Sequence, residues 1–115
     1  MQEVDINTLV NKNNKLNKNI PNDIIIIGKI DELYIKYKHD QLDLSRVECY
    51  KIIYHNQKGE SIKNHILPDS LSELYCSENQ LASLPIFENE MVLVFNQDKP
   101  IEYIPYTKNI ELFDG

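Results

Sequence analysis

Glycine, arginine and tryptophan are scarce in this chain, and each shortage argues against a class of function. Tryptophan is absent, and Arg46 is the single arginine among 115 residues. The three glycines, Gly28, Gly59 and Gly115, are far apart, so no glycine-rich loop can cradle phosphate groups. Neither G-x-S-x-G nor H-E-x-x-H occurs in the sequence. We therefore predict that the protein is not an enzyme, with no catalytic residues and no cofactor.

Histidine and cysteine are also few, and their spacing argues against a metal site. No Cys or His lies at metal-ligand spacing from His39, His55 or His65, whereas a zinc site needs about four ligands. We expect no metal, and we expect the histidines at the surface or at strand ends. Cys76 has acidic neighbours, which disfavour a thiolate, so we predict a core residue. A disulfide with Cys49 is not expected, because no secretion signal is seen.

Charge and hydropathy argue against two kinds of partner. The formal net charge of −6 disfavours binding to phosphate backbones, which needs clustered Lys and Arg, so no nucleic acid is expected. The one basic stretch, residues 11–18, contains no aromatic residue and is interpreted as a solvated segment. The longest apolar run, residues 24–27, is far shorter than the roughly 20 residues that span a bilayer. We expect no membrane partner and a cytoplasmic location.

A leucine pattern at residues 67–85 is the most informative feature that the chain does contain. The leucines are Leu67, Leu71, Leu74, Leu81 and Leu84. With Cys76 and Asn79 they form L-x-x-L-x-C-x-x-N-x-L, and a Leu-Pro pair stands on each side. Leu74 and Cys76 have the two-residue period of a strand, and Asn79 can hydrogen-bond backbone groups in the turn that follows.

This pattern resembles the short, proline-containing leucine-rich repeats of bacterial effectors and of similar proteins in large DNA viruses. The resemblance implies a solenoid of stacked coils that binds other proteins. Ile, Asn and Lys are common while Arg and Ala are rare, which is the codon bias of an AT-rich genome and agrees with such a source. For a viral protein, the location would be the host cytoplasm.

Further copies of the pattern are weaker. A shift of 20 residues places Val94 in the position of Leu74, although Asn96 and Lys99 replace the Cys and the Asn. A third start follows Pro105, with Ile110, Leu112 and Phe113. Upstream, residues 20–24 resemble residues 67–71, and Ile27 would then correspond to Leu74.

The remaining patterns predict the positions of strands, a hairpin and a short helix. Alternation and β-branched residues predict strands at 24–27, 33–37 and 47–55, and a turn signal at 57–60 predicts a hairpin across 47–66. The apolar cluster at residues 4–10 fits a short helix that caps the first coil. Further strands are predicted at about 72–76, 91–95 and 110–113.

The predicted fold class is an α/β leucine-rich-repeat solenoid of four to five irregular coils. It consists mostly of short parallel strands, turns and extended legs, with little helix. Residues 1–19 form a polar N-terminal segment or cap, and residues 20–115 form the solenoid, which is clearest at 67–105.

The outward positions of the strands predict a binding surface. Leu71, Leu74 and Cys76 point inward, which leaves Glu73 and Tyr75 outward. Stacking the next layer places Leu93 beside Glu73 and Phe95 beside Tyr75. Aromatic residues anchor interfaces, so we predict that Glu73, Tyr75, Leu93 and Phe95 bind a partner protein. Two alternatives stay open: the N-terminal segment covers the strip, or a one-residue slip exchanges the faces.

The predicted function is therefore a non-enzymatic adaptor that binds a partner through the concave sheet. The alternative is a self-assembling structural component, viral or bacterial. The sequence stops within a repeat at residues 113–115, and a homodimer would close the open sheet edge expected there.

Overall fold

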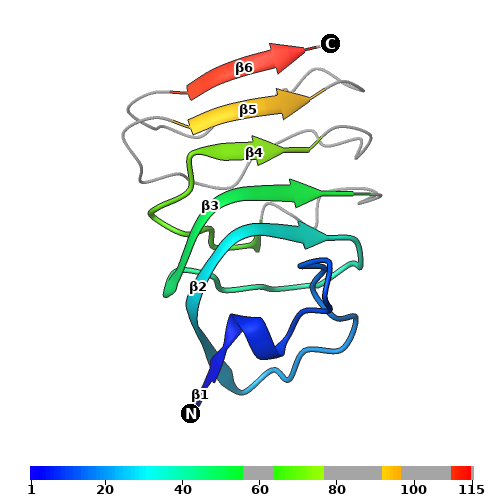
Figure 1. Cartoon of the computed structure of the whole chain (residues 1–115), viewed down its shortest axis with the longest axis vertical. Helices are drawn as coiled ribbons and strands as arrows, with labels where there is room; N and C mark the ends of the chain where they lie inside the picture. The colour runs from blue at the N-terminus through cyan, green and yellow to red at the C-terminus, as the bar shows by residue number, and fades with distance from the viewer. Residues whose placement is uncertain (56–63, 77–91, 97–109, 115) are drawn as a thin grey trace.

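Six parallel strands form one sheet in this computed structural model, which describes residues 1–55, 64–76, 92–96 and 110–114. The elements are β1 (Gln2–Asp5), the 3-10 helix η1 (Ile6–Thr8), β2 (Ile24–Ile35), β3 (Val47–Tyr54), β4 (Glu73–Tyr75), β5 (Val92–Asn96) and β6 (Ile110–Asp114). The strand order is β1-β2-β3-β4-β5-β6, and every neighbouring pair is parallel. Each strand thus lies directly above the preceding one (Figure 1).

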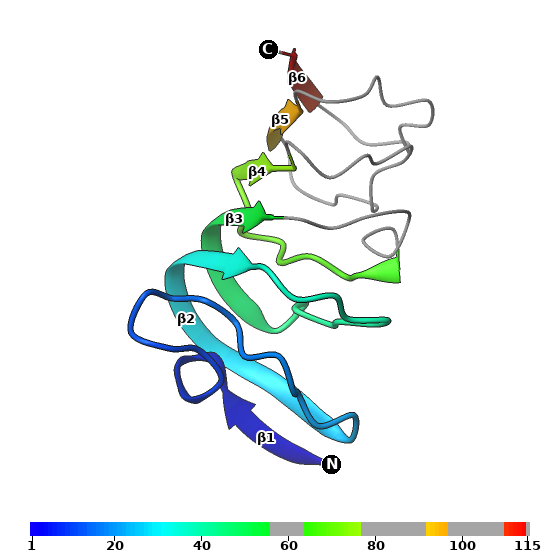
Figure 2. The same cartoon turned by 90° about the vertical axis from the view of Figure 1, so that its right-hand side faces the viewer.

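Consecutive parallel strands require the chain to return behind the sheet after each strand. It does so through extended legs, so successive coils stack as in a β-solenoid (Figure 2). The first leg comprises residues 17–23, the second 38–46, and the third is described over residues 64–72. The predicted parallel, mostly-strand architecture with little helix is confirmed for the described residues. The strands predicted at 72–76, 91–95 and 110–113 correspond to β4, β5 and β6.

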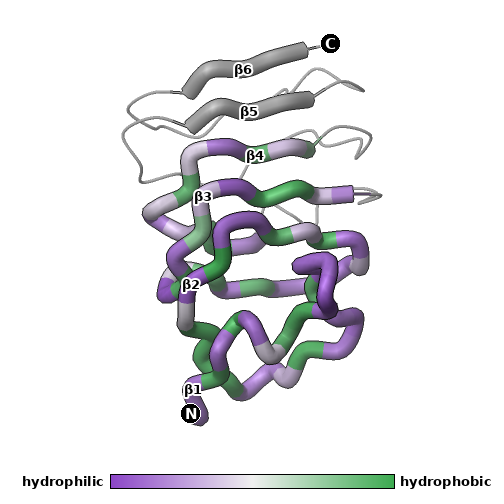
Figure 3. The backbone as a smooth tube through the Cα atoms, viewed as in Figure 1, coloured by the Kyte–Doolittle hydropathy of each residue, from purple (hydrophilic) through white to green (hydrophobic). Residues whose placement is uncertain are grey.

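One sequence pattern builds the core of three successive coils. The register aligns Leu33 with Ile52 and Ile52 with Leu74, and all three side chains are fully buried. The pattern apolar-x-x-apolar-x-apolar occupies residues 30–35, 49–54 and 71–76. Its buried members are Ile30, Leu33, Ile35, Cys49, Ile52, Tyr54, Leu71, Leu74 and Cys76. Figure 3 shows apolar and polar residues intermixed along β2, β3 and β4, as expected where one side faces the core.

At the same level in each of these coils, two consecutive residues point away from the core. They are Asp31 and Glu32, Tyr50 and Lys51, and Ser72 and Glu73. The register of β2 with β3 skips one residue pair here, between Ile30–Cys49 and Glu32–Lys51. The interruption of the two-residue period lets the chain bend, and Figure 2 shows β2 and β3 curving sharply.

Gly28 divides β2 into two parts. Residues 24–27 pair with β1, while Gly28 and the residues after it pair with β3. Gly28 has φ +107°, and a Cβ atom there would lie 2.7 Å from Asp5 Oδ1, so both the backbone and the space require glycine. The prediction that Ile27 corresponds to Leu74 is wrong, because Ile27 pairs with Asp5 and the register places Leu33 in that position.

The N-terminal residues cover the free edge of β2. They form a strand and one 3-10 turn in place of the predicted helix, because residues 2–5 pair with β2. Asn7 Nδ2 donates to Lys29 O at 2.9 Å. Further along, Leu16 N donates to Tyr34 O at 2.8 Å and Tyr34 N donates to Asn14 O at 2.9 Å. Backbone groups that an edge strand would expose are thereby paired.

The hairpin predicted across residues 47–66 is wrong. β3 has parallel neighbours on both edges, β2 and β4, so no edge is left for an antiparallel partner. Ile66 instead forms a parallel bridge with Asp43 of the second leg. The predicted turn at residues 57–60 lies outside the described residues, as do Asn79, Lys99 and the Leu-Pro pair at 84–85.

Two of the three histidines are buried, which corrects the prediction that they lie at the surface or at strand ends. His65 Nε2 lies 2.8 Å from His39 O, and its Nδ1 lies 2.8 Å from the Tyr54 hydroxyl. A carbonyl only accepts, so Nε2 carries the proton and the Tyr54 hydroxyl donates to Nδ1. Only His55 is exposed. The His65 ring therefore joins β3 to the second and third legs.

Candidate functional site

The register of the sheet aligns two columns of positions, whose described side chains in β2, β3 and β4 lie on the outer face. The register runs through Tyr34, Ile53, Tyr75, Phe95 and Phe113 in one column. It runs through Glu32, Lys51, Glu73, Leu93 and Glu111 in the other. We call these ten positions the strip. Its first column is aromatic or aliphatic in every strand from β2 to β6.

The described side chains of the strip hold one another in place. Lys51 Nζ lies 4.7 Å from the centre of the Tyr75 ring and 3.7 Å from Glu32 Oε1. The Tyr75 hydroxyl donates to Glu73 Oε1 at 2.8 Å. These contacts link three adjacent strands across the strip, so side chains from β2, β3 and β4 are ordered before any partner arrives. Such preorganisation reduces the entropy that binding must overcome.

Carboxylates dominate the charge of the strip. Glu73 accepts hydrogen bonds from both Tyr75 and Tyr50, and these bonds are the main reason why the pKa of each phenol is raised above its usual value. Both tyrosines therefore stay neutral donors near neutral pH. Lys51 opposes the charge of Glu32, but the glutamates outnumber it along the column. In sequence, the second column carries three glutamates and one lysine, and we call it the acidic column.

The neighbours predicted from the sequence are the neighbours in the sheet. Glu73 is paired in register with Leu93, and Tyr75 with Phe95. Leu74 and Cys76 are fully buried while Tyr75 is half-exposed, so a one-residue slip of β4 is excluded. The binding role assigned to these four residues remains a prediction.

Six further members of the strip were not predicted from the sequence: Glu111 and Phe113 in β6, and Glu32, Tyr34, Lys51 and Ile53 in β2 and β3. The last four are the more informative. Their signal was present, because residues 30–35 and 49–54 share the apolar-x-x-apolar-x-apolar pattern of residues 71–76. The simple alternation of residues 33–37 conceals this pattern, because alternation alone predicts a strand without relating it to residues 71–76. Alignment on this pattern would have placed Tyr34 and Ile53 in the column of Tyr75.

The cysteines are poorly placed for nucleophilic chemistry. Cys49 and Cys76 are both buried and unbonded to each other, which agrees with the core position predicted for Cys76. Burial, with the nearby carboxylates of Asp31 and Glu32, raises the pKa of the Cys49 thiol to about 11. A thiol with so high a pKa is almost entirely protonated near neutral pH and is a weak nucleophile.

Neither the arrangement of metal-ligating side chains nor similarity to known proteins assigns a function to this chain. Within the described ranges, no group of three or more His, Cys, Asp or Glu side chains is placed to hold a metal ion. In the same part of the chain, no helix has the length and apolar character needed to cross a membrane. No family model, no curated protein and no solved structure matches this chain.

Proposed function

We propose that this chain is a small leucine-rich-repeat-type solenoid of four to five coils that binds a partner protein through the strip, without catalysing a reaction. The observation that carries the proposal is the in-register column Tyr34, Ile53, Tyr75, Phe95 and Phe113. Tyrosine and phenylalanine are typical anchors of protein interfaces, and they bury large areas at a low entropic cost. A parallel sheet holds their spacing rigidly.

The charge of the strip favours a partner with basic side chains. Glu32, Glu73 and Glu111 outnumber Lys51 in the acidic column, and the chain as a whole carries a net charge of −6. Complementary charges of this kind accelerate association and select among partners more than they add to affinity. Binding should therefore slow as the salt concentration rises.

The test is capture of proteins from native lysate by the full chain and by Tyr75→Ala/Phe95→Ala, with mass spectrometry of the bound proteins. The captured protein is then purified, and its dissociation constant is measured for each variant. We expect the double substitution to weaken binding at least about a hundredfold, because interface aromatic anchors typically contribute about 2 kcal/mol or more each. Tyr37→Ala is the matched control, since Tyr37 is an exposed tyrosine away from the strip.

Equal affinities of the double variant and the parent chain would reject the strip as the binding surface. An equal loss in Tyr37→Ala would do the same, because the effect would then not depend on position. The urea midpoint of each variant is measured first, so that loss of folding is not mistaken for loss of binding.

A second candidate function is self-assembly through the edge of β6. Among the described strands, β6 is the last in the sheet and has one neighbour, β5. Edge strands pair readily with a second copy. Sedimentation equilibrium over a hundredfold range of concentration would support this candidate if it showed a dimer whose dissociation is unaffected by Tyr75→Ala/Phe95→Ala. A monomer throughout would exclude it over that range.

A further inference from the structure

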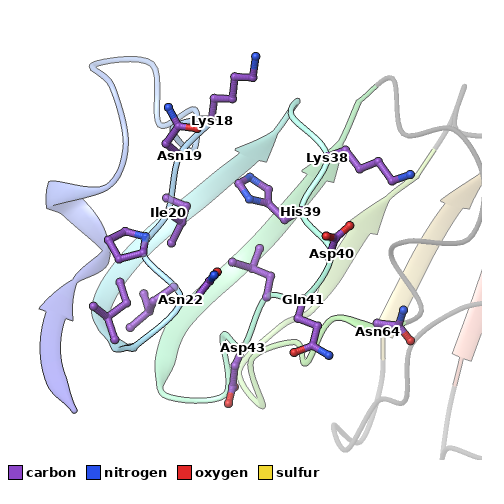
Figure 4. Close-up of a pocket in the computed structure, with 14 residues that line it drawn as sticks. Lys18, Asn19, Ile20, Asn22, Lys38, His39, Asp40, Gln41, Asp43 and Asn64 are labelled. Atoms are coloured by element: carbon purple, nitrogen blue, oxygen red, sulfur yellow. The ribbon is translucent and has the colours of Figure 1, made fainter.

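A groove of about 1330 Å³ lies on the side of the coils away from the strip, between the first and second legs (Figure 4). Its apolar floor is formed by Ile20, Ile24, Ile26 and Leu42. Its charged lining is Lys18, Lys38, Asp40 and Asp43, and Pro21 and Asn22 line it from the first leg.

An isolated parallel bridge between Asp43 and Ile66 joins the second leg to the third, and the other edge of the second leg lies toward the groove. Leu44 N donates to Ile66 O and Ile66 N donates to Leu42 O, both at 2.8 Å. In a parallel bridge, the residue opposite Ile66, which is Asp43, directs its own N–H and C=O to the other side. The alternation of exposed and buried side chains from Gln41 to Leu44 indicates the same orientation for Gln41. Leu42 and Leu44 are buried while Gln41 and Asp43 are exposed.

The first leg does not extend this bridge. Pro21, at the centre of that leg, has no N–H to donate. The groove therefore lies between the first and second legs. It adjoins the edge of the second leg that is opposite the edge paired with the third leg. A chain segment lying in the groove would pair with the second leg, as the third leg does on the opposite edge.

His39 supplies a second, independent feature of the groove, which is a buried polar atom. Its ring is buried and points from the second leg toward the first (Figure 4), and its Nε2 atom has no hydrogen-bond partner among the described residues. By contrast, both ring nitrogens of the other buried histidine, His65, are paired. An unpaired buried nitrogen is destabilising, and most such groups in native proteins have a partner. A hydrogen-bond partner supplied from the groove, an acceptor or a donor according to the tautomer of the ring, would remove that deficit.

The lining favours recognition of a main chain over recognition of charge or of flat rings. Lys18 and Lys38 balance Asp40 and Asp43, so the lining has no excess of either sign. None of the described lining residues is a Phe, Tyr or Trp, so they offer no aromatic surface on which a base or a sugar ring could stack. The backbone edge at residues 40–44 remains as the main recognition element.

We propose that this groove is a second binding site, which takes an extended peptide segment of a partner protein as an added strand beside residues 40–44. Strand addition draws its affinity from main-chain hydrogen bonds and its selectivity from alternate side chains that reach the floor. Five residues of edge extend over roughly 16 Å, which a peptide of about seven residues covers.

The test begins with a phage-displayed library of linear random heptapeptides, selected on the full chain. Counter-selection uses Asn22→Trp, which introduces bulk from the first leg into the groove. Selected peptides are synthesised with N-methyl groups on alternate amides, in two complementary sets. We expect one set to weaken binding at least about tenfold and the other to leave it unchanged, because only every second amide faces the edge. Amide exchange at Gln41 and Asp43 should slow when the peptide binds.

Matched variants separate the groove from other surfaces. Asn17→Trp adds the same bulk to the same leg outside the groove and should retain binding, as should Tyr75→Ala in the strip. His39→Leu should weaken binding and also raise the urea midpoint, since it removes an unpaired nitrogen. That combination would not arise if His39 only supported the fold.

Three results would overturn the proposal. The first is a selection that yields no peptide sensitive to Asn22→Trp. The second is binding that tolerates both sets of N-methyl groups, because affinity would then come from side chains alone. The third is a glycan array signal that is lost in Asn22→Trp, in the absence of peptide binding, which would identify a carbohydrate site.

Discussion

Acid should destabilise this protein at pH values where its carboxylates are still ionised, because two buried histidines resist protonation. Burial is the main cause that lowers the pKa of both His39 and His65. Protonation of His65 would place a second proton on Nδ1, which now accepts from the Tyr54 hydroxyl. His39 differs in that Asp40 partly opposes the effect of burial.

The sign of the effect follows from linkage. A histidine whose pKa is lowered by folding binds fewer protons in the native state than in the unfolded state below about pH 6.5. Its stabilising contribution is therefore complete above that pH and is lost as the pH falls. The upper limit is set by the proton that the unfolded chain binds, about 1.4 kcal/mol for each histidine between about pH 7.5 and 5.5. For the two together, the limit is about 2.8 kcal/mol.

Urea unfolding followed by circular dichroism at closely spaced pH values measures this loss. Tyr54→Phe removes the hydroxyl that donates to Nδ1, so it should lower stability by about 1–3 kcal/mol near neutral pH. It should also flatten the pH dependence, because the vacated Nδ1 can then be protonated with less conflict. His55→Gln is the matched control, since His55 is exposed, and it should leave the slope unchanged. A free energy of unfolding that stays constant from about pH 7.5 to 5.5 would refute the reasoning.

Three other predictions concern single positions in the coils. Gly28→Ala should destabilise the chain by more than about 1 kcal/mol in urea unfolding, because φ is +107° and the added Cβ meets Asp5; equal stability of the variant would contradict this account. Ser70→Ala should lower the free energy of unfolding by about 1 kcal/mol, since Ser70 Oγ accepts from Cys49 N at 2.8 Å and donates to Cys49 O at 3.1 Å. Ser70→Thr keeps the hydroxyl and should retain most of that stability. Cys49, with its pKa raised to about 11, should react with iodoacetamide at least about a hundredfold more slowly in the native chain than in urea, and mass mapping of early alkylation at Cys49 would disprove its burial.

The parallel strands were predictable because one local pattern dictates them. The spacing of Leu71, Leu74 and Cys76 fixes which side of β4 faces the core, and a shift of 20 residues is enough to place Phe95 beside Tyr75. Nothing beyond the period of a strand and the stacking of coils is needed to derive the centre of the strip.

The remaining features depend on contacts between residues distant in sequence. A glycine such as Gly28 does not predict a continuous strand, yet β2 continues through it. Asp5, distant in the sequence, occupies the space that a side chain at this position would need. The buried ring of His65 has two hydrogen-bond partners that are distant in the sequence. The Tyr54 hydroxyl is 11 residues away, and the His39 carbonyl is 26 residues away. The groove could not be predicted from the sequence. It forms because the second leg pairs with the third leg and not with the first.

The cover over the edge of β2 has a consequence for protein design. All of its parts, β1, the Asn7 carboxamide and the backbone at residues 14–16, lie within the first 35 residues together with the strand that they protect. The information for covering that edge is therefore local and transferable. Fused ahead of an unrelated stack of parallel strands, this segment should pair with the edge of the first strand and replace it with the short edge strand β1.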